Sequence, residues 1–326
     1  MRTRPLSIAA LLVAAAGLTA CGAPDDGPGG CEPLVPPGAA SDRVQVEQGE
    51  GAPTVEFQHP LVSDGMQVSH LGGGDERVSR GGIVDADYVV YSGKTGLEIT
   101  SSYAAESAQA PAAEPLRVTA GGESTLGQAV ACAAAGESIV LTTSIEALFG
   151  AGAASEELDI EPNDTAVVVL EVKEVHPGRA EGSPRPGEQG MPAISLATDG
   201  TPGVTFPGSP APAELRVMQS IAGDGEPVAE GDSVLVHYTG IIWETEEVFD
   251  SSWERGAPTA MTIDDANLIP GFVDAVVGQP IGSQVVVSIP QELGYSDPAT
   301  RPASIGEGEH LLFVIDILDR LEPVAG

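Results

Sequence analysis

A β-strand is predicted at residues 233–238, which read Ser233-Val234-Leu235-Val236-His237-Tyr238. Val234, Val236 and Tyr238 recur at every second position, as they do in a strand with one buried face. A β-branched run predicts another strand at residues 285–289. The last strand is predicted at residues 311–317, where Leu311, Phe313, Ile315 and Ile317 share one face and Asp316 lies on the other.

One stretch between these strands has the periodicity of a helix. Ile269, Phe272, Val273 and Val276 fall at positions i, i+3, i+4 and i+7. Pro270 stands at its start and Gly278 just past its end, where these residues are favoured. Several antiparallel strands with one short helix predict an α+β domain, in which the helix covers one face of a curved sheet.

The earlier part of the chain repeats this plan. Residues 88–93 parallel 235–240, residues 99–103 parallel 249–253, and Leu126, Ala129, Val130 and Ala133 repeat the helical spacing. Ile160 precedes Val168 by the interval that separates Ile305 from Phe313. Four landmarks in the same order favour two copies of one domain over two unrelated α+β domains. The copies are predicted at 53–177 and 203–326, joined by a flexible Pro- and Gly-rich linker at 178–202.

The N-terminal residues have the features of a targeting signal. A basic start and an apolar stretch at 6–18 precede Leu18-Thr19-Ala20-Cys21, which resembles the lipobox of bacterial lipoproteins. Residues 1–20 are therefore predicted to be a signal peptide, in preference to an ordinary secretory signal cut near Ala20. An acylated Cys21 would anchor the chain to the outer face of a membrane. Residues 21–52 are predicted to be a flexible tether.

The composition excludes several classes of function. The formal net charge is −34, from 14 basic and 48 acidic residues, so the surface repels nucleic-acid phosphates and anionic lipid headgroups. The five histidines show no spacing typical of metal ligands, and neither a Gly-x-Ser-x-Gly elbow nor a phosphate-binding loop is present. Outside the cytoplasm Cys31 and Cys132 can form a disulfide or remain two thiols, and the sequence does not decide between these.

The later domain carries a longer series of motifs. It contains Val236-His237-Tyr238-Thr239-Gly240, Val248-Phe249-Asp250-Ser251-Ser252, Leu268-Ile269-Pro270-Gly271-Phe272 and Pro290-Gln291-Glu292-Leu293-Gly294-Tyr295. Arg255, Pro258, Ile305 and Leu311-Leu312-Phe313 complete it. In order and spacing this series resembles the FKBP-type peptidyl-prolyl cis-trans isomerases over about 120 residues. The resemblance implies two FKBP-like domains, each a curved antiparallel sheet wrapped around one short α-helix.

The resemblance also implies roles for individual residues in an enzyme that acts on proline-containing polypeptides and uses no cofactor or metal. Aromatic and aliphatic side chains would enclose the proline, the Ile269 N–H and Tyr295 hydroxyl would bind substrate carbonyls, and Arg255 and Tyr238 would hold Asp250 at the rim. The catalytic residues are expected to be Asp250, Tyr295, Tyr238 and Phe249. The substrate-binding residues are expected to be Arg255, Ile269, Phe272, Leu268, Met261, Ile305 and Phe313.

Both domains depart from the family pattern. Phe272 replaces the usual tryptophan of the floor, and Thr259 and Met261 stand where aromatic residues are common. In the first copy Tyr91 takes the place of Tyr238, Ile99 that of Phe249 and Thr100 that of Asp250. The floor falls at Leu126, Gln128 or Ala129, and the Tyr295 position at Ala151 or Phe149. Without an acid and an aromatic floor, the first copy is predicted to be catalytically inert and to serve as a spacer, a peptide-binding platform or a dimerisation surface.

Three functions fit this pattern. The leading one is a lipid-anchored, extracytoplasmic prolyl isomerase (rotamase) that assists the folding of exported proteins. The alternative is a non-catalytic FKBP-like chaperone or adaptor that binds peptides in the same cup. A receptor for a small apolar ligand also fits the cup but has no independent support. Asp250, Tyr238 and Tyr295 favour the enzyme, whereas Thr259 and Met261 favour the adaptor.

Overall fold

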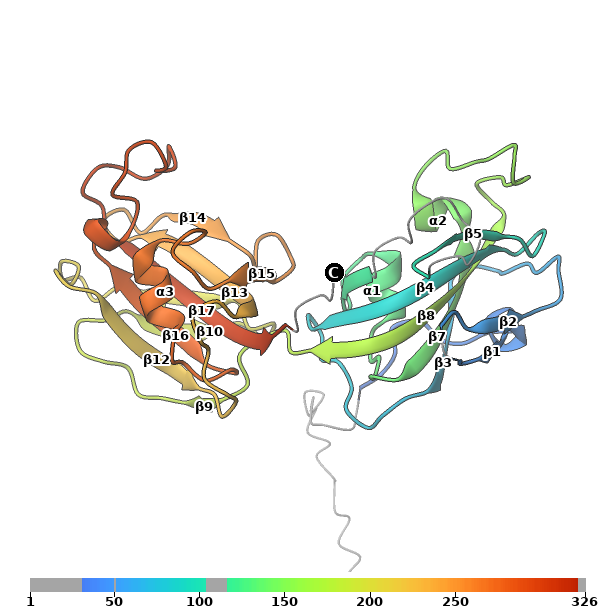
Figure 1. Ribbon diagram of the computed structural model, residues 1–326, viewed down its shortest axis with the longest axis horizontal. Helices are drawn as coiled ribbons and strands as arrows, with labels where there is room; N and C mark the ends of the chain where they lie inside the picture. The colour runs from blue at the N-terminus through green and yellow to red at the C-terminus, as the bar shows by residue number, and fades with distance from the viewer. Residues whose placement is uncertain (1–30, 50, 104–115, 322–326) are drawn as a thin grey trace, which may run out of the picture.

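Two antiparallel sheets of matching topology form the chain in this computed structural model, which describes residues 31–49, 51–103 and 116–321 (Figure 1). The first sheet has the strand order β3-β7-β8-β4-β5, and β6 also pairs with β4. The second has the equivalent order β12-β16-β17-β13-β14, with β15 on β13 and an added strand β9 beyond β12. The predicted α+β architecture, repeated twice, is confirmed.

The elements of the first sheet and its helices are β3 (Gln67–Gly72), β4 (Ile83–Ser92), β5 (Glu98–Ser101), β6 (Leu116–Thr119), α1 (Thr125–Ala129), β7 (Glu137–Ser144), α2 (Ile145–Phe149) and β8 (Thr165–His176). Those of the second are β9 (Ser183–Pro184), β12 (Arg216–Ala222), β13 (Ser233–Ile242), β14 (Val248–Ser251), β15 (Thr259–Thr262), α3 (Pro270–Val276), β16 (Gln284–Ile289), the 3-10 turn η2 (Gln291–Leu293) and β17 (Leu311–Arg320).

Each sheet buries both of its faces. On β16, Val285 and Val287 pack with α3 on one face, whereas Val286 belongs to a separate cluster on the other. A strand with one exposed face alternates apolar and polar residues, whereas a strand buried on both faces is apolar at nearly every position. This explains why the run at 285–289 is almost wholly apolar. Helix α3 begins with Pro270 in its first turn and is followed by Gly278 at φ 82°, as its sequence punctuation predicts.

An N-terminal arm covers the face of the first sheet that points away from α1 and α2. The arm contains η1 (Ser41–Arg43) and a hairpin of β1 (Gln45–Glu47) and β2 (Thr54–Glu56). Ala40 and Val44 are buried against Val167 and Val169 of β8, and Gln67 Oε1 accepts a hydrogen bond of 2.9 Å from the Ala40 N–H. The expectation of a flexible tether is therefore wrong for the described residues of 31–52, because these apolar side chains seal a sheet face that would otherwise be exposed.

The segment predicted as a flexible linker forms the equivalent arm of the second sheet. Strands β10 (Ala193–Leu196) and β11 (Pro202–Thr205) make its hairpin, and Met191 is buried with Trp243 and Leu312 on the outer face. Asp316, which the sequence places on this face, accepts a hydrogen bond of 2.9 Å from the Ala180 N–H. The flexible linker at 178–202 is therefore corrected to a packed part of the second unit.

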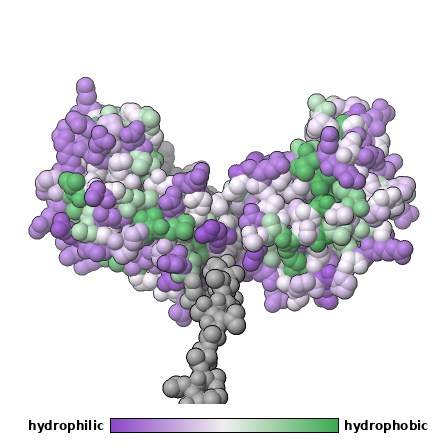
Figure 2. All heavy atoms as spheres, turned by 180° about the vertical axis from the view of Figure 1, so that it is seen from behind, coloured by the Kyte–Doolittle hydropathy of each residue, from purple (hydrophilic) through white to green (hydrophobic). Residues whose placement is uncertain are grey.

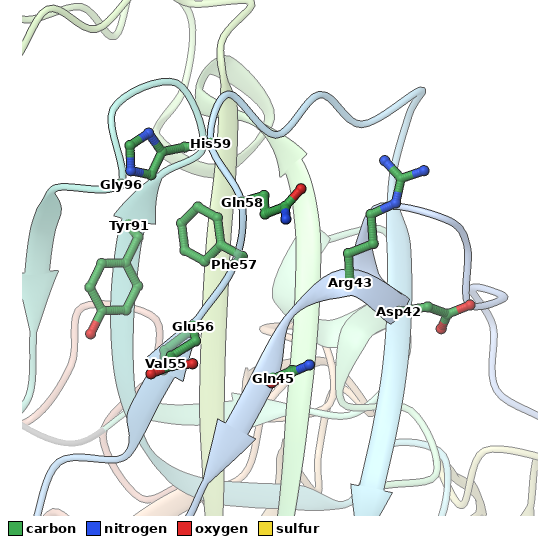
Figure 3. A pocket seen from close by; sticks show the side chains of 10 residues that line it. All are labelled: Asp42, Arg43, Gln45, Val55, Glu56, Phe57, Gln58, His59, Tyr91 and Gly96. Carbon is green, nitrogen blue, oxygen red and sulfur yellow. The ribbon is translucent and has the colours of Figure 1, made fainter.

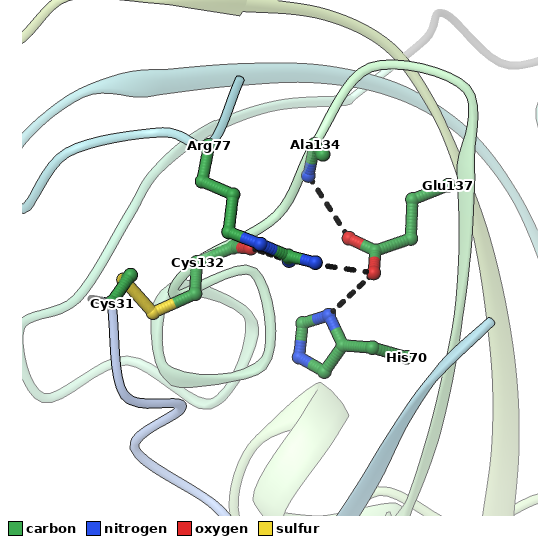
Figure 4. The surroundings of a disulfide bond; sticks show 6 residues. All are labelled: Cys31, His70, Arg77, Cys132, Ala134 and Glu137. Carbon is green, nitrogen blue, oxygen red and sulfur yellow. Dashed lines mark hydrogen bonds and ion pairs between the residues drawn. A yellow bond between two sulfur atoms is a disulfide. The ribbon is translucent and has the colours of Figure 1, made fainter. Parts of the chain in front are cut away.

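A disulfide joins Cys31, at the start of the first arm, to Cys132, with a Cα–Cα distance of 5.6 Å (Figure 4). This settles the pairing that the sequence left open. Cys132 has a left-handed φ of 66°, and Arg77 Nη1 donates to its carbonyl at 2.7 Å. Glu137 lies beside them, where its buried carboxylate accepts from the Ala134 N–H at 2.9 Å and faces His70 Nδ1 at 3.2 Å.

The two units touch through a small mixed contact, near the ends of β8 and β17 (Figure 1). Its apolar part is formed by Ile83, Leu235 and Leu318. Its polar part joins His176 Nδ1 to Asp319 Oδ2 at 2.8 Å. Burial opposes protonation of His176, but its contacts with Asp319 and Asp85 outweigh burial and raise the pKa of the imidazole to about 9.

The surface is mainly hydrophilic, with smaller apolar patches on both units in the view of Figure 2. Within the described ranges, no helix has the length and apolar character needed to cross a membrane. The predicted signal peptide and Cys21 lie outside the described residues.

Candidate active site

Four aromatic side chains meet on the helix-facing side of the second sheet. They come from β13, β14, α3 and β17, so residues that are far apart in the sequence are brought together by the fold. Phe313 lies at their centre, edge-on to Phe249 at 5.5 Å and to Phe272 at 5.4 Å between ring centroids. Tyr238 lies 6.3 Å from Phe313 and 6.5 Å from Phe272. Edge-to-face rings at these distances attract one another and form a rigid apolar surface.

Gly240 allows this close approach. A Cβ atom at that position would lie 2.6 Å from Phe249 Cζ and 2.9 Å from Phe313 Cε1. The Thr239-Gly240 step is therefore required by packing: any larger residue would push the two rings apart.

A polar triangle borders the aromatic cup. The Tyr238 hydroxyl donates to Asp250 Oδ2 at 2.5 Å, and Arg255 Nη2 donates to the Tyr238 hydroxyl at 2.8 Å. Arg255 Nη1 also forms an ion pair with Asp250 Oδ1, and the guanidinium lies over the Tyr238 ring at 5.4 Å. Burial and the Asp250 contact raise the pKa of Tyr238, so its hydroxyl stays protonated and donates.

The remaining predicted site residues surround the same cup. Ile305 is buried in it, and Leu268, Ile269, Met261 and Tyr295 pack against it while remaining partly exposed. Ile269 is the N-cap residue of α3, with φ −67° and ψ 143°. Among the hydrogen bonds of the described residues, none uses the Ile269 N–H as donor. Burial, with the nearby charge of Asp250, raises the pKa of Tyr295, which keeps this hydroxyl protonated too.

The later domain matches a family of known activity. The family model described as FKBP-type peptidyl-prolyl cis-trans isomerase matches residues 224–318. The FK506-binding protein of Streptomyces anulatus is 37% identical over 117 residues, which are 36% of this chain and 94% of that protein. The chain belongs to the FKBP family. It is a peptidyl-prolyl cis-trans isomerase, and its substrates are proline-containing peptides.

Two other known proteins are similar to part of the chain. The probable FK506-binding protein of Corynebacterium glutamicum is 35% identical over 118 residues, covering 36% of this chain and 96% of that protein. The solved structure of FkpA from Escherichia coli is 27% identical with a TM-score of 0.30, over 41% of this chain and 52% of that one.

A buried network behind the cup was missed at the level of sequence. Ser252 Oγ accepts from the Tyr238 N–H at 2.8 Å and lies 2.7 Å from His237 Nδ1. The His237 ring stacks on Trp253, with 3.8 Å between the ring centroids. Burial lowers the pKa of His237 to about 4, so the ring is neutral near pH 7. His237 belongs to a motif of the FKBP series and Trp253 directly follows another, but nothing in their spacing indicates that they stack.

The two copies align differently from the sequence comparison. In the first sheet the Tyr88 N–H donates to Ser102 Oγ at 2.9 Å, which matches the bond from Tyr238 to Ser252. Tyr88, three residues before Tyr91, is therefore the true counterpart of Tyr238. Tyr91 lies on the opposite face of the sheet, where it packs edge-on against Phe57 of the arm at 6.1 Å (Figure 3).

A cavity of about 810 Å³ lies beside Tyr91 and Phe57 (Figure 3). Its lining includes Arg43, Glu56 and His59 of the arm. It belongs to the first unit and contains none of the predicted site residues, so it is separate from the isomerase cup.

Within its described residues, the first unit has neither an acid at the Asp250 position nor an aromatic ring at the floor position. Thr100 lies opposite Val90 where Asp250 lies opposite Gly240, which confirms that no acid is present at this position. Cys132 follows α1 and Gly278 follows α3, and both have a left-handed φ. If these two residues are equivalent, Leu126 in the first unit occupies the position that Phe272 occupies in the second, because each lies the same number of residues earlier. The open choice of floor residue is thus settled as Leu126.

Proposed function

We propose that the second domain catalyses X-Pro isomerisation by holding the proline ring in the aromatic cup. The Ile269 N–H and the Tyr295 hydroxyl then donate to substrate carbonyls on either side of it. The single observation that carries this proposal is the polar triangle of Tyr238, Asp250 and Arg255 at the edge of four converging aromatic rings. A plain core has no need of an acid and a guanidinium among its rings.

The chemistry follows from the nature of the peptide bond. The barrier to cis/trans rotation is about 18–20 kcal/mol, because twisting the bond breaks amide resonance. The twisted state has a less polar carbonyl and a more pyramidal nitrogen than the planar states. An apolar cup that excludes water favours this twisted state, and fixed donors orient the flanking carbonyls. Asp250, held by Arg255 and Tyr238, faces the substrate amide at the rim.

The test is the rate of cis–trans isomerisation of an Ala-Leu-Pro-Phe-type peptide by the full chain and two variants. Asp250→Ala and Tyr295→Phe should each lower kcat/KM by about tenfold or more, equivalent to ~1.4 kcal/mol of lost transition-state stabilisation. Thr100→Ala, at the matching position of the first unit, should leave the rate unchanged. Wild-type rates in both second-domain variants would refute these roles.

We also propose that the protein is an extracytoplasmic lipoprotein anchored to the cell membrane through Cys21, where it assists the folding of exported proteins. The lipobox-like residues 18–21 and the Cys31–Cys132 disulfide support this, since structural disulfides persist in oxidising compartments. Proline isomerisation takes tens of seconds unassisted and so limits folding. Cys21→Ala should release the protein from the membrane fraction, and retention of that variant would count against the anchor.

The alternative is a non-catalytic chaperone or adaptor. Met261 and Thr259 on β15 form a wall of the cup without an aromatic ring, and a flexible methionine adapts to varied apolar segments. A folded wild-type chain that binds proline-containing peptides without accelerating their isomerisation would favour this function.

For the first unit we propose that it is catalytically inert and acts as a spacer or a peptide-binding platform. Thr100 and Leu126 at the acid and floor positions support this. In the full chain carrying Asp250→Ala and Tyr295→Phe together, kcat/KM should fall by about a hundredfold or more, the product of the two single losses. Adding Thr100→Ala and Leu126→Ala in the first unit should lower it no further, and a further fall would mean that the first unit is active.

A further inference from the structure

A cluster of ionisable side chains lies at the junction of the two units, near the end of β8. Asp85 of β4 lies directly opposite Glu174 of β8, and Ile83 lies opposite His176. Residues two apart on neighbouring strands share a face of the sheet. One side-chain atom from each of Asp85, Glu174 and His176 therefore lies within 4.8 Å of the other two.

The decisive feature of this cluster is the Nε2 atom of His176. The side chain is only 3% exposed, and Nε2 is buried without a hydrogen-bond partner among the described residues. Nε2 faces Asp85 Oδ2 at 3.5 Å and Glu174 Oε2 at 3.8 Å. A buried polar atom that lacks a partner destabilises the folded state, so its position calls for a ligand between these three groups.

The charges at the cluster favour a cation. Two carboxylates directly opposite each other on neighbouring strands repel one another. Arg117 offsets only one of them, since it donates to the two oxygens of Asp85 at 2.8 and 2.5 Å. The whole chain, at a formal charge of −34, attracts cations to its surface as well.

We propose that Asp85, Glu174 and His176 bind a Zn²⁺ ion, with water as the fourth ligand. Zinc takes nitrogen and carboxylate ligands at about 2.0–2.2 Å in a tetrahedron, which places ligand atoms about 3.4 Å apart. Nε2 lies 3.5 and 3.8 Å from the two carboxylate oxygens, and all three atoms lie within 4.8 Å of one another, so reaching that spacing requires a contraction of at most about 1.4 Å. The imidazole ligand favours zinc over Mg²⁺ and Ca²⁺, which prefer oxygen ligands alone.

Two further residues support the site from outside. Asp319 accepts from His176 Nδ1 at 2.8 Å, which holds a proton on that nitrogen and leaves Nε2 as the atom that exchanges its own proton for the ion. Arg117 holds the Asp85 carboxylate in place, and each oxygen retains a lone pair for the ion. The Glu174 side chain is 58% exposed and provides a route for entry of the ion. Because Asp319 belongs to the second unit, a bound ion would stabilise the contact between the units.

The experiment is a calorimetric titration of the full chain with Zn²⁺ after treatment with a chelator. We expect one site per chain, unaffected by equal concentrations of Mg²⁺ or Ca²⁺. Binding should release a proton, because the ion and a proton compete for Nε2, and titration in buffers of different ionisation enthalpy measures that release. Glu174→Gln should weaken binding at least tenfold without affecting folding, because its side chain is exposed.

Three further variants sharpen this test. His176→Gln should abolish binding, and Asp319→Asn should weaken it by about 10–100-fold through loss of orientation alone. His310→Gln is the matched control, since His310 also pairs with a carboxylate, Glu244 at 2.9 Å, but has no second acid among the described residues on its other nitrogen. Absence of Zn²⁺ binding, or equal affinity in Glu174→Gln and wild type, would overturn the proposal and leave a protonated His176 and Arg117 as the partners of the two carboxylates.

Discussion

The Tyr238 hydroxyl donates a 2.5 Å hydrogen bond to Asp250, which joins a ring in the floor of the cup to a carboxylate whose side chain is 42% exposed. Arg255 contacts both partners from the solvent side. The carboxylate is therefore fixed from beneath by a hydroxyl and from outside by a guanidinium, and its orientation depends on the buried partner.

Tyr238→Phe removes this hydroxyl and preserves the ring. We expect kcat/KM to fall by about 5- to 10-fold, because one charge-assisted hydrogen bond contributes roughly 1–1.5 kcal/mol. The stability should change by a similar amount at most. Peptide isomerisation and thermal unfolding measure the two effects. Tyr88→Phe, at the true counterpart in the first unit, serves as control, and a Tyr238→Phe rate equal to wild type would contradict the orienting role.

Phe272→Leu places leucine, the residue found at the equivalent position Leu126 of the first unit, in the floor of the isomerase cup. Leucine is aliphatic and of similar bulk, so we expect only ~1 kcal/mol of destabilisation. The edge contact with Phe313 at 5.4 Å would be lost, and kcat/KM should fall at least tenfold. The reverse change, Leu126→Phe, should create no activity because Thr100 supplies no acid. A fully active Phe272→Leu enzyme would show that an aromatic floor is dispensable.

Cys31→Ala opens a covalent loop that spans 101 residues of sequence. Cross-links over loops of this size stabilise proteins by about 2–5 kcal/mol, mainly by restricting the unfolded chain. The first unit should therefore unfold at lower urea concentration, while isomerase activity in native buffer is unchanged. Cys31 is the better site for substitution because it is exposed, whereas Cys132 has a left-handed φ of 66°. An unchanged urea midpoint would show that the arm is held by packing alone.

Asp316 should make the stability of the second unit depend on pH. Burial raises the pKa of this carboxyl to about 6, despite hydrogen bonds from Ala180 and Gln284 that lower it. The folded state therefore prefers the protonated form, and its contribution is complete below about pH 4 and is lost as the pH rises through 6. We expect wild type to gain stability relative to Asp316→Asn, by up to about 3 kcal/mol, between pH 7 and pH 4.

Chemical denaturation of both proteins across this range measures the difference. Asp274→Asn, an exposed change on α3, is the control and should follow wild type at every pH. A constant difference between wild type and Asp316→Asn would show that this carboxyl does not titrate between pH 4 and 7.

Much of the fold and the cup was predictable from sequence because both depend on local pattern. The alternation at 233–238 and 311–317 and the helical spacing from Ile269 to Val276 correspond to β13, β17 and α3. The predicted site residues of the second domain lie together at one cup, as the order and spacing of the motifs indicate.

Three features depend on contacts that no local pattern reveals. The arms are rich in Pro and Gly, so their composition indicates flexibility, although Val44 is buried against the first sheet and Met191 against the second. Matching Tyr91 to Tyr238 aligned the tyrosine and glycine residues of the two sequences but displaced the strand by three residues. A displacement by an odd number of residues exchanges the two faces of a strand, so the match was wrong. The junction cluster joins cross-strand partners that lie about 90 residues apart, and no spacing rule for metal ligands describes such a pair.

The packed arms also determine where this protein can be divided. A fragment that begins at Gly203 would retain the entire isomerase cup and yet lack Met191 and Ile194, which cover Trp243, Leu312 and Val314 on the far side of the sheet. That bare face would be a contiguous apolar surface, and such surfaces promote self-association in solution. Useful cleavage or fusion points therefore lie near Pro177, before the arm, so that the smallest portable catalytic module is considerably longer than the region shared with single-domain relatives.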